Sequence, residues 1–220
     1  MMYTISDLYD LNHTLAKDYL SQFTYPWEAL GGIKAMIISL GETLDPAEYV
    51  QTAPKVWVHR TAAVAPTAFL GAPCIIGPQT EVRHCAFVRG SALVGAGCVV
   101  GNSVELKNVI LFDSVQTPHY NYVGDSILGY RSHMGAGSVT SNVKSDKTTV
   151  TVRMGEEVIE TGLKKMGAML GDEVEVGCNS VLNPGTIVGR NSNIYPLSSV
   201  RGTVPANHIH KNSAAVVAKR

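Results

Sequence analysis

Charge is scarce in this sequence and is balanced in sign. The 18 Lys and Arg residues are matched by 18 Asp and Glu residues, so the formal net charge is +0 at pH 7. A chain without a basic excess has no overall electrostatic attraction toward nucleic acid or toward an anionic membrane surface. Neither is expected as a partner, and the function has to be inferred from local chemistry.

Cysteine and long apolar segments are also limited. The four cysteines, Cys74, Cys85, Cys98 and Cys178, show no CxxC spacing. Cys74 and Cys98 occupy positions at which small residues recur, which favours packed free thiols over disulfides or a structural metal. No signal peptide and no apolar run of membrane-spanning length are found. Together with the free thiols, this indicates a cytoplasmic protein.

Large aromatic side chains are rare, whereas glycine is frequent, with 4 Phe, 2 Trp and 21 Gly. Against this background, one apolar residue recurs at every sixth position without interruption. The series is Val58, Val64, Leu70, Ile76, Val82, Val88, Val94, Val100, Leu106 and Phe112. A period of six is typical of neither an α-helix nor an ordinary β-hairpin. It is typical of a parallel β-helix built from hexapeptides, with three per triangular coil and aliphatic side chains inside. We therefore predict an all-β fold.

The remaining segments interrupt or precede this pattern. Residues 1–50 carry apolar residues at helical spacing and predict a small N-terminal helical cap over one end of the β-helix. Residues 51–210 form the β-helix domain, and residues 211–220 a C-terminal tail. The repeat breaks at about 113–122 and 141–169, which predicts loop insertions. In repeat folds, such insertions usually gather on the functional face.

Two cations are separated by one predicted coil. Arg89 and Lys107 are 18 residues apart, so they are expected to stack about 4.8 Å apart on adjacent coils. Stacked cations repel each other unless an anion lies near them. Glu105, two positions before Lys107, offers a partial counter-charge. The pair is either two solvated surface cations or a phosphate-binding site, for which the guanidinium fork is well suited.

A histidine follows in the first predicted insertion. His119 comes after Pro118 and 12 residues after Lys107. Imidazole titrates near neutral pH, so His119 is a candidate general base beside the cations. A purely structural role for this histidine stays open.

Three motifs with a fixed order and spacing surround these residues. They are Gly101-Asn102-Ser103-Val104-Glu105-Leu106-Lys107, Pro118-His119-x-x-Tyr122-x-Gly124-Asp125 and Gly135-Ala136-Gly137-Ser138-x-Thr140-x-Asn142. Over about residues 58–210, the sequence resembles the acetyltransferase domain of the bifunctional N-acetylglucosamine-1-phosphate uridyltransferase/glucosamine-1-phosphate acetyltransferase family. The archaeal sugar-phosphate branch is the most similar. Parallel crossovers are normally right-handed, but the resemblance implies the left-handed β-helix of that family.

The resemblance implies an acetyl-CoA-dependent N-acetyltransferase that acts on an amino-sugar phosphate. Glucosamine 1-phosphate is the family's acceptor, on the route to UDP-N-acetylglucosamine. It also implies a homotrimer with sites between neighbouring prisms. His119 corresponds to the base that deprotonates the sugar amine. The residues assigned to the substrate are Arg89, Glu105, Lys107, Tyr122, His133 and Asn142, and those assigned to coenzyme A are Ala136, Lys147 and Cys178.

The sequence departs from the bacterial members of that family at several points. They have Asn where His133 stands and Tyr where Val143 stands. Residues 1–50 are too few for a nucleotidyltransferase domain and contain no Gly-rich phosphate loop. Uridyl transfer by this chain is therefore not expected. The sugar stays open, because galactosamine 1-phosphate or a nucleotide-linked amino sugar offers the same amine and phosphate.

Two alternatives belong to other classes of protein. A zinc site like that of hexapeptide carbonic anhydrases would use His84, His119 and His133, which lack that family's close histidine pair. A non-catalytic sugar-nucleotide sensor or assembly module would keep the pocket without turnover. Thiol release from acetyl-CoA separates the sensor from the enzyme.

Overall fold

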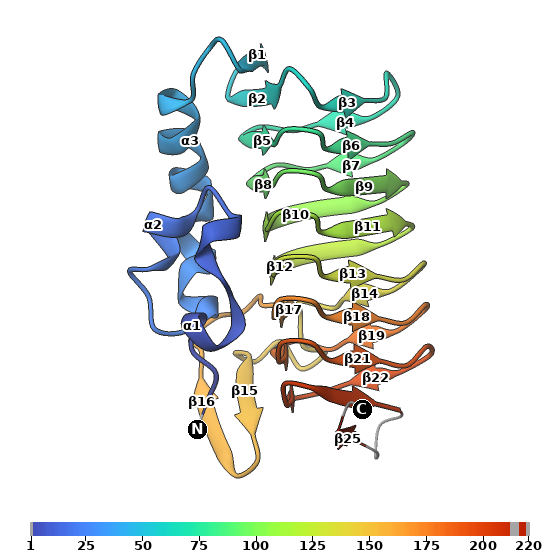
Figure 1. Ribbon diagram of the computed structural model, residues 1–220. Coiled ribbons are helices and arrows are strands. Elements are labelled where there is room, and N and C mark those ends of the chain that lie inside the picture. Colours follow the sequence, from blue (N-terminus) through green and yellow to red (C-terminus); the bar gives the residue numbers. More distant parts are fainter. Residues whose placement is uncertain (1, 212–215, 219–220) are drawn as a thin grey trace.

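Short parallel strands stack in three columns along a triangular prism in the computed structural model, which describes residues 2–211 and 216–218 (Figure 1). The β-helix is left-handed, as the resemblance implied. We call its sides the first, second and third faces. The strands β10 and β12 run around the corner between the third and first faces, and so pair on both.

The first face contains β2 (Val56–His59), β5 (Cys74–Ile76), β8 (Ala92–Val94), β10 (Glu105–Leu111), β12 (Tyr122–Leu128), β17 (Ala168–Leu170), β20 (Thr186–Val188) and β23 (Thr203–Val204). The second face contains β3 (Ala63–Val64), β6 (Glu81–Val82), β9 (Val99–Asn102), β11 (Gln116–His119), β13 (His133–Met134), β18 (Glu175–Val176), β21 (Asn193–Ile194) and β24 (His208–His210). The third face contains β4 (Phe69–Leu70), β7 (Phe87–Val88), the starts of β10 and β12, β14 (Val139–Thr140), β19 (Val181–Leu182) and β22 (Ser199–Val200).

The predicted apolar row fills the prism. Val88, Val94 and Leu106 are fully buried, and each side chain of this kind stabilises the fold by about 1.5–3 kcal/mol relative to an exposed one. Neighbouring coils repeat every 18 residues at first, as in the pairing of Leu106 with Val88. The hexad pattern therefore predicted the core correctly up to this coil.

The coil length then changes to 17 residues. Leu111, not Phe112, pairs with Val94, because two residues separate Leu106 from Val109 where three separate the corresponding Val88 and Ala92. Phe112 instead packs against Tyr9, with ring centroids 5.0 Å apart. The extension of the six-residue lattice to Phe112 was wrong. So was the loop insertion expected at about 113–122, which the structure replaces with β11 and the start of β12.

The N-terminal helices lie along the first face rather than over the end of the prism (Figure 1). They are α1 (Ile5–Leu8), η1 (Leu11–His13), α2 (Lys17–Leu20), η2 (Pro26–Gly32) and α3 (Ile33–Thr43). The first face needs a cover because its outward side is also apolar: Ile75, Leu93 and Ile110 are buried. The predicted N-terminal helices are confirmed, but their expected position over one end of the prism was wrong. None of the described helices is both long and apolar enough to cross a lipid bilayer.

Antiparallel strands close the two ends of the β-helix. β1 (Tyr49–Ala53) pairs with β2, and β25 (Val216–Ala218) pairs with β24. Such pairing covers an edge that would otherwise invite association with another sheet. Part of the segment expected to be a tail is thus a strand, while residues 212–215 and 219–220 lie outside the described part of the chain.

One long insertion leaves the prism between β14 and β17. It carries the hairpin of β15 (Thr151–Met154) and β16 (Glu157–Glu160), seen at the lower left of Figure 1. At its base, Met166 N donates to Asn142 O at 3.0 Å. Gly167 N donates to the Asp125 carbonyl at 2.8 Å. These bonds hold Asn142 beside the corner between the third and first faces.

Candidate functional site

A buried carboxylate organises the corner between the third and first faces. Asp125 is 4% exposed. Lys107 Nζ donates to its two carboxylate oxygens at 2.8 and 3.0 Å. Asn108 Nδ2 donates to Oδ1 at 2.9 Å, and Asn142 Nδ2 donates to Oδ2 at 2.6 Å. Donors from the coil before and the coil after therefore converge on one anion, which fixes their positions.

The backbone of this corner explains the convergence. Asn108 and Asp125 have φ values of 55° and 49°, a left-handed conformation that Asn and Asp adopt more readily than most residues. Lys107 pairs with Gly124 in the ladder between β10 and β12. Asp125 directly follows Gly124, so its carboxylate lies within hydrogen-bonding distance of the Lys107 amine.

Tyr122 joins this group from the middle of the third face. Its hydroxyl accepts a hydrogen bond from Asn142 Nδ2 at 3.1 Å. Partial burial raises the pKa of Tyr122, and the nearby Asp125 carboxylate raises it further. The phenol therefore stays neutral at physiological pH, and its own O–H remains a donor that can contact a bound ligand.

Arg89 pairs with Glu105 rather than opposing Lys107. Arg89 Nη1 lies 2.8 Å from Glu105 Oε1, and the bond to this carboxylate raises the pKa of Arg89. With Asp125 facing Lys107, each of the two cations has its own carboxylate. The two cations are therefore balanced within the chain, and Glu105 supplies the counter-charge to Arg89. The exposed guanidinium still has further N–H donors.

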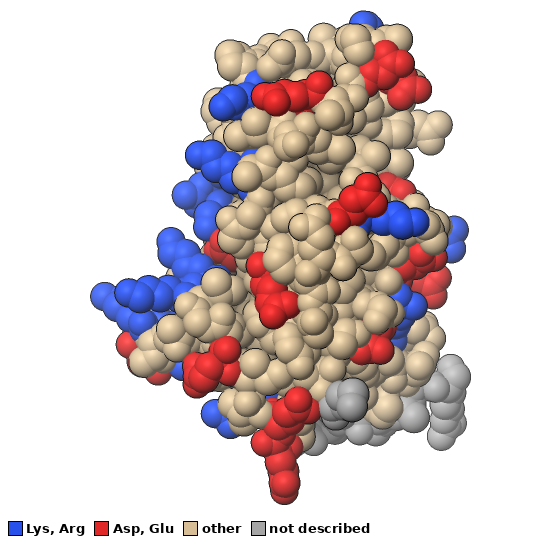
Figure 2. Space-filling view, turned by 90° about the vertical axis from the view of Figure 1, so that its left-hand side faces the viewer, with Lys and Arg blue, Asp and Glu red and all other residues tan. Residues whose placement is uncertain are grey.

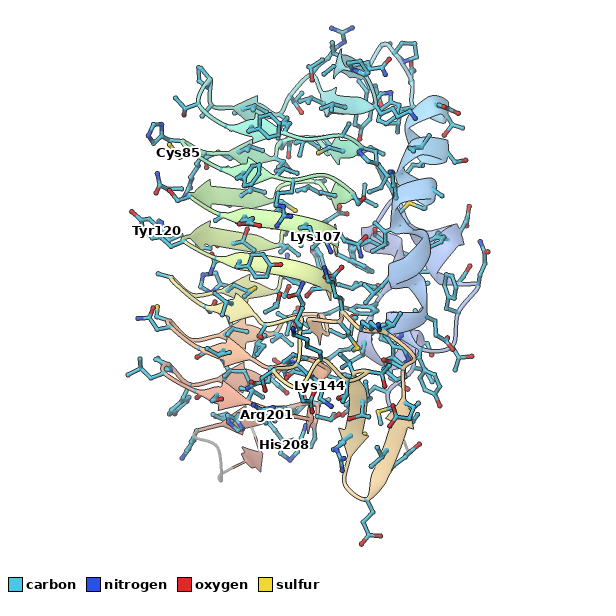
Figure 3. The ribbon with its side chains drawn as sticks, turned by 180° about the vertical axis from the view of Figure 1, so that it is seen from behind. Cys85, Lys107, Tyr120, Lys144, Arg201 and His208 are labelled. Carbon is cyan, nitrogen blue, oxygen red and sulfur yellow. The ribbon has the colours of Figure 1, made fainter. Side chains whose placement is uncertain are left out.

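His119 lies at the opposite edge of the third face, at the end of β11. Its peptide N–H donates to Asn121 Oδ1 at 3.2 Å, and its carbonyl accepts from Gly137 N at 3.0 Å. Its side chain is exposed. In Figure 3 the neighbouring Tyr120 lies at one edge of the prism, and Lys107 lies across the strands from it. Because Tyr122 follows His119 by three positions, their Cα atoms are at most about 10 Å apart.

The coenzyme candidates divide between two places. Ala136 lies on the next coil under His119, and its carbonyl accepts from Asn179 N at 2.8 Å, which places Cys178 one coil further along the same edge. Lys147 lies in a turn of the insertion, where its N–H donates to Lys144 O at 3.0 Å. The structure thus aligns Ala136 and Cys178 with His119, but not Lys147.

His133 lies on a different face from Tyr122. Its Nδ1 is 2.8 Å from Glu175 Oε2 on the second face. The two residues line a hollow of about 510 Å³ together with Ser114, Gln116 and Arg131. Within one chain, His133 therefore does not reach the group around Tyr122. No three His, Cys, Asp or Glu side chains in the described ranges converge closely enough to hold a metal ion.

Sequence reasoning missed the residue at the centre of this group. The sequence patterns include Asp125 only within a motif, and they do not include Asn108. The signal was present, because Asp125 follows Lys107 by 18 residues, the same coil spacing that led to the comparison of Arg89 with Lys107. A carboxylate one coil from a lysine predicts an ion pair at a prism corner.

The insertion adds positive charge beside this corner. Lys147, Lys164 and Lys165 are exposed, and Lys144 lies below Lys107 in Figure 3. Figure 2 shows Lys and Arg side chains gathered at the left edge of the molecule, the side seen in Figure 3. A cationic surrounding of this kind favours ligands that carry phosphate groups.

Comparison with known proteins gives relatives that are named as bifunctional. A bifunctional sugar-1-phosphate nucleotidylyltransferase/acetyltransferase from Sulfurisphaera tokodaii is 33% identical over 91 residues, which are 41% of this chain and 23% of that protein. The bifunctional protein GlmU from Methanocaldococcus jannaschii is 34% identical over 86 residues, 39% of this chain and 21% of that protein. The matched segments thus span less than a quarter of these relatives.

Solved structures show more distant likeness. UDP-N-acetylglucosamine acyltransferase from Campylobacter jejuni matches with a TM-score of 0.38 and 14% identity, over 72% of this chain and 73% of that chain. A mutant of GDP-perosamine N-acetyl transferase from Caulobacter crescentus matches with a TM-score of 0.28 and 15% identity, over 69% and 50%.

A family match covers the part of the chain that contains the site. Residues 73–183 match the family described as the GMPPB C-terminal domain. The matched range is half of the sequence and includes both cations, His119 and Asp125. This protein belongs to the GMPPB C-terminal domain family.

Proposed function

We propose that this protein is an acetyl-CoA-dependent N-acetyltransferase for an amino-sugar phosphate, with glucosamine 1-phosphate as the simplest acceptor. The observation that carries the proposal is the third face, which has Tyr122, Asn142 and two cations on one side and an exposed His119 on the other. The relative named as a bifunctional sugar-1-phosphate nucleotidylyltransferase/acetyltransferase supports it. Such a reaction belongs to nucleotide-sugar biosynthesis, with UDP-N-acetylglucosamine as the end product we favour.

The polar side of the third face suits the sugar phosphate. Arg89 offers free N–H donors beside Glu105, and Lys107 presents an amine that is held in place by Asp125. Charge-assisted hydrogen bonds from both cations to the phosphate would orient the sugar. The hydroxyl of Tyr122 and the amide of Asn142 contact the ring. Holding the acceptor in this way makes the attack effectively intramolecular.

His119 acts as the general base in this proposal. A sugar ring at Tyr122 places its amine toward His119, because the two residues are close along the same coil. The neutral imidazole takes a proton from the amine as the nitrogen attacks the thioester carbonyl. The N–C bond forms, the C–S bond breaks, and the proton leaves with coenzyme A as the free thiol. We favour direct transfer over an acyl-enzyme, because within the described ranges no Ser or Cys side chain hydrogen-bonds to the His119 ring.

The edge of the prism below His119 suits the thioester. Gly137 N–H is already donated to the His119 carbonyl, and we assign the preceding Ala136 N–H to the oxyanion of the tetrahedral intermediate. Coenzyme A then runs along this edge past Cys178. In the proposed homotrimer, a neighbouring prism brings its His133 and Lys147 to the site.

A thiol-release assay tests the proposal. Purified protein is mixed with acetyl-CoA and with glucosamine 1-phosphate, galactosamine 1-phosphate or, as the matched control without an amine, glucose 1-phosphate. We expect thiol release with an amino sugar and none with the control. Binding of amino-sugar phosphates without turnover would instead favour the non-catalytic sensor or assembly module, and would overturn the enzyme proposal.

A further inference from the structure

Two phenylalanine rings stand outward on the third face and have no part in the site described above. Phe69 is 59% exposed and Phe87 is 43% exposed. Their ring centroids are 5.7 Å apart, with the ring planes tilted by 57°. The sequence contains only 4 Phe in all, so the exposure of two on adjacent coils needs an explanation. Exposed aromatic rings in a cluster commonly mark a binding surface.

The rings belong to the same ladder as the substrate residues. Phe69 pairs with Phe87, Phe87 pairs with Glu105, and Glu105 pairs with Tyr122. Outward side chains at these positions form one column on the third face. With about 4.8 Å per coil, the column extends about 14 Å from Tyr122 to Phe69. A sugar 1-phosphate at Tyr122 and Arg89 occupies the lower half only.

The cation lies between the two parts of the column. Arg89 follows Phe87 by two residues, so both side chains leave the same side of the chain. Its guanidinium is 2.8 Å from Glu105 Oε1, and Glu105 lies on the coil between Phe87 and Tyr122. The order along the face is therefore aromatic pair, guanidinium, then hydroxyl and amide.

We infer that the acceptor is an amino sugar linked to a nucleoside diphosphate, whose base stacks on Phe69 and Phe87. Arg89 and Lys107 then bind the diphosphate, and Tyr122 and Asn142 hold the sugar. This inference rests on the proposed function and names its substrate class. Acetyl transfer is unchanged: the sugar nitrogen bonds to the acetyl carbon, and coenzyme A leaves as the thiol.

The polar residues within the column favour this occupant over a second copy of the chain. An interface between two prisms would be most stable if the outward residues along the whole face were apolar. Here the outward row passes from Phe69 and Phe87 to the charged Glu105, with Arg89 beside it. Adjacent rings and a guanidinium are the usual chemistry for nucleotides, because any base can stack and any phosphate can pair.

Nucleotide binding tests the inference without relying on turnover. UDP, GDP and dTDP are titrated calorimetrically into the unaltered protein and into the variants Phe87→Ala and Phe69→Ala. The control variant is Tyr195→Ala, because Tyr195 is an exposed aromatic residue that directly follows β21 of the second face. We expect at least one nucleotide to bind, with about tenfold weaker binding in both Phe variants and no change in the control.

Turnover then tests the substrate class. The amino sugar linked to the best-bound nucleoside diphosphate is compared with glucosamine 1-phosphate. We expect a kcat/KM about tenfold or more higher for the nucleotide-linked acceptor, a preference that Phe87→Ala removes without lowering turnover of glucosamine 1-phosphate.

The two proposals fail in different ways. If no acceptor releases thiol, the proposed function fails, but nucleotide binding that is lost in Phe87→Ala still supports the nucleotide site. If no nucleotide binds, or if neither Phe variant weakens nucleotide binding, the inference is overturned. The inference is also overturned if Phe87→Ala dissociates an oligomer but leaves nucleotide affinity unchanged, because a second copy of the chain then covers the rings.

Discussion

Lys107 Nζ and the Asp125 carboxylate face each other across adjacent coils, with 2.8 Å and 3.0 Å between the amine and the two oxygens. The aspartate is buried, whereas the lysine side chain is 28% exposed. The buried Asp125 carboxylate thus holds the Lys107 amine in place, while the amine remains accessible to solvent. A phosphate that approaches Lys107 meets a cation already fixed in position, so little side-chain entropy is lost on binding.

Replacing the buried partner tests this arrangement. Asp125→Asn keeps the size of the side chain but removes the charge that three donors share. We expect the free energy of unfolding to fall by about 2 kcal/mol, because a buried network with mismatched donors loses its charge-assisted bonds. Urea denaturation measures this value. Asp146→Asn is the matched control, since Asp146 is exposed and 3.7 Å from Lys144. An Asp125 variant as stable as the control would contradict the prediction.

Lys107→Gln separates binding from chemistry. The amide cannot supply a charge to the phosphate, so the KM for the sugar-phosphate acceptor should rise about tenfold while kcat changes less. Steady-state thiol release measures both parameters. Lys17→Gln serves as the control, because this lysine bonds to Asn12 within the N-terminal segment. Equal effects of the two substitutions would remove Lys107 from the binding site.

The sequence predicted the prism but not what covers it. Inward residues repeat every six positions, and this period alone indicates hexapeptide coils. The placement of the helices depends on a second row, in which Ile75, Leu93 and Ile110 point outward and are buried. Each of them directly precedes an inward apolar residue of the same strand, so apolar residues are consecutive there. Consecutive apolar residues of this kind indicate that another element covers the outward side of the face, and this pattern is visible in the sequence.

The site was predictable where it depends on coil spacing. Lys107 and Tyr122 lie near each other because both belong to the corner and column that the lattice defines. The shortening of the coil by one residue was missed, because it preserves the apolar pattern on either side. His133 precedes inward Met134 of the second face, whereas Tyr122 precedes inward Val123 of the third. Contacts between chains would decide whether two prisms bring these faces together, and the hexapeptide repeat within one chain does not contain this information.

His119→Ala tests the proposed base. The side chain is exposed and its backbone bonds are independent of the ring, so the variant should fold normally. We expect kcat to fall about 100-fold or more, with acceptor affinity retained. Thiol-release assays and calorimetric binding give the two readouts. His84→Ala is the control, since His84 is an exposed histidine on the same edge that bonds to Thr67. Retention of a tenth of the turnover in the His119 variant excludes it as the base.

Two of the four thiols should react with a thiol reagent, and the other two should be protected. Burial raises the pKa of Cys74 and of Cys98 to about 12, whereas Cys85 and Cys178 are exposed. Because the thiolate is the reactive form, the buried pair should resist modification. Titration of the native protein with a disulfide reagent at mildly alkaline pH should therefore modify only the exposed pair, and titration in urea should modify all four cysteines. Cys85→Ser and Cys178→Ser should each lower the native count by one thiol. Full modification of the native protein would contradict the buried positions.

A buried histidine predicts loss of stability in acid. His210 occupies an inward position beside Ile194, and its ring nitrogens have no hydrogen-bond partner among the described residues. Burial lowers the pKa of His210 below 6.5, so the unfolded state binds more protons at mildly acidic pH, and stability falls as pH decreases through that value. His210→Val continues the apolar row and should reduce the difference in melting temperature between slightly alkaline and mildly acidic buffer. His208→Gln, at a half-exposed histidine whose Nδ1 lies near Ala206 O, should preserve it. An unchanged difference in the His210 variant would show that this ring does not govern the acid response.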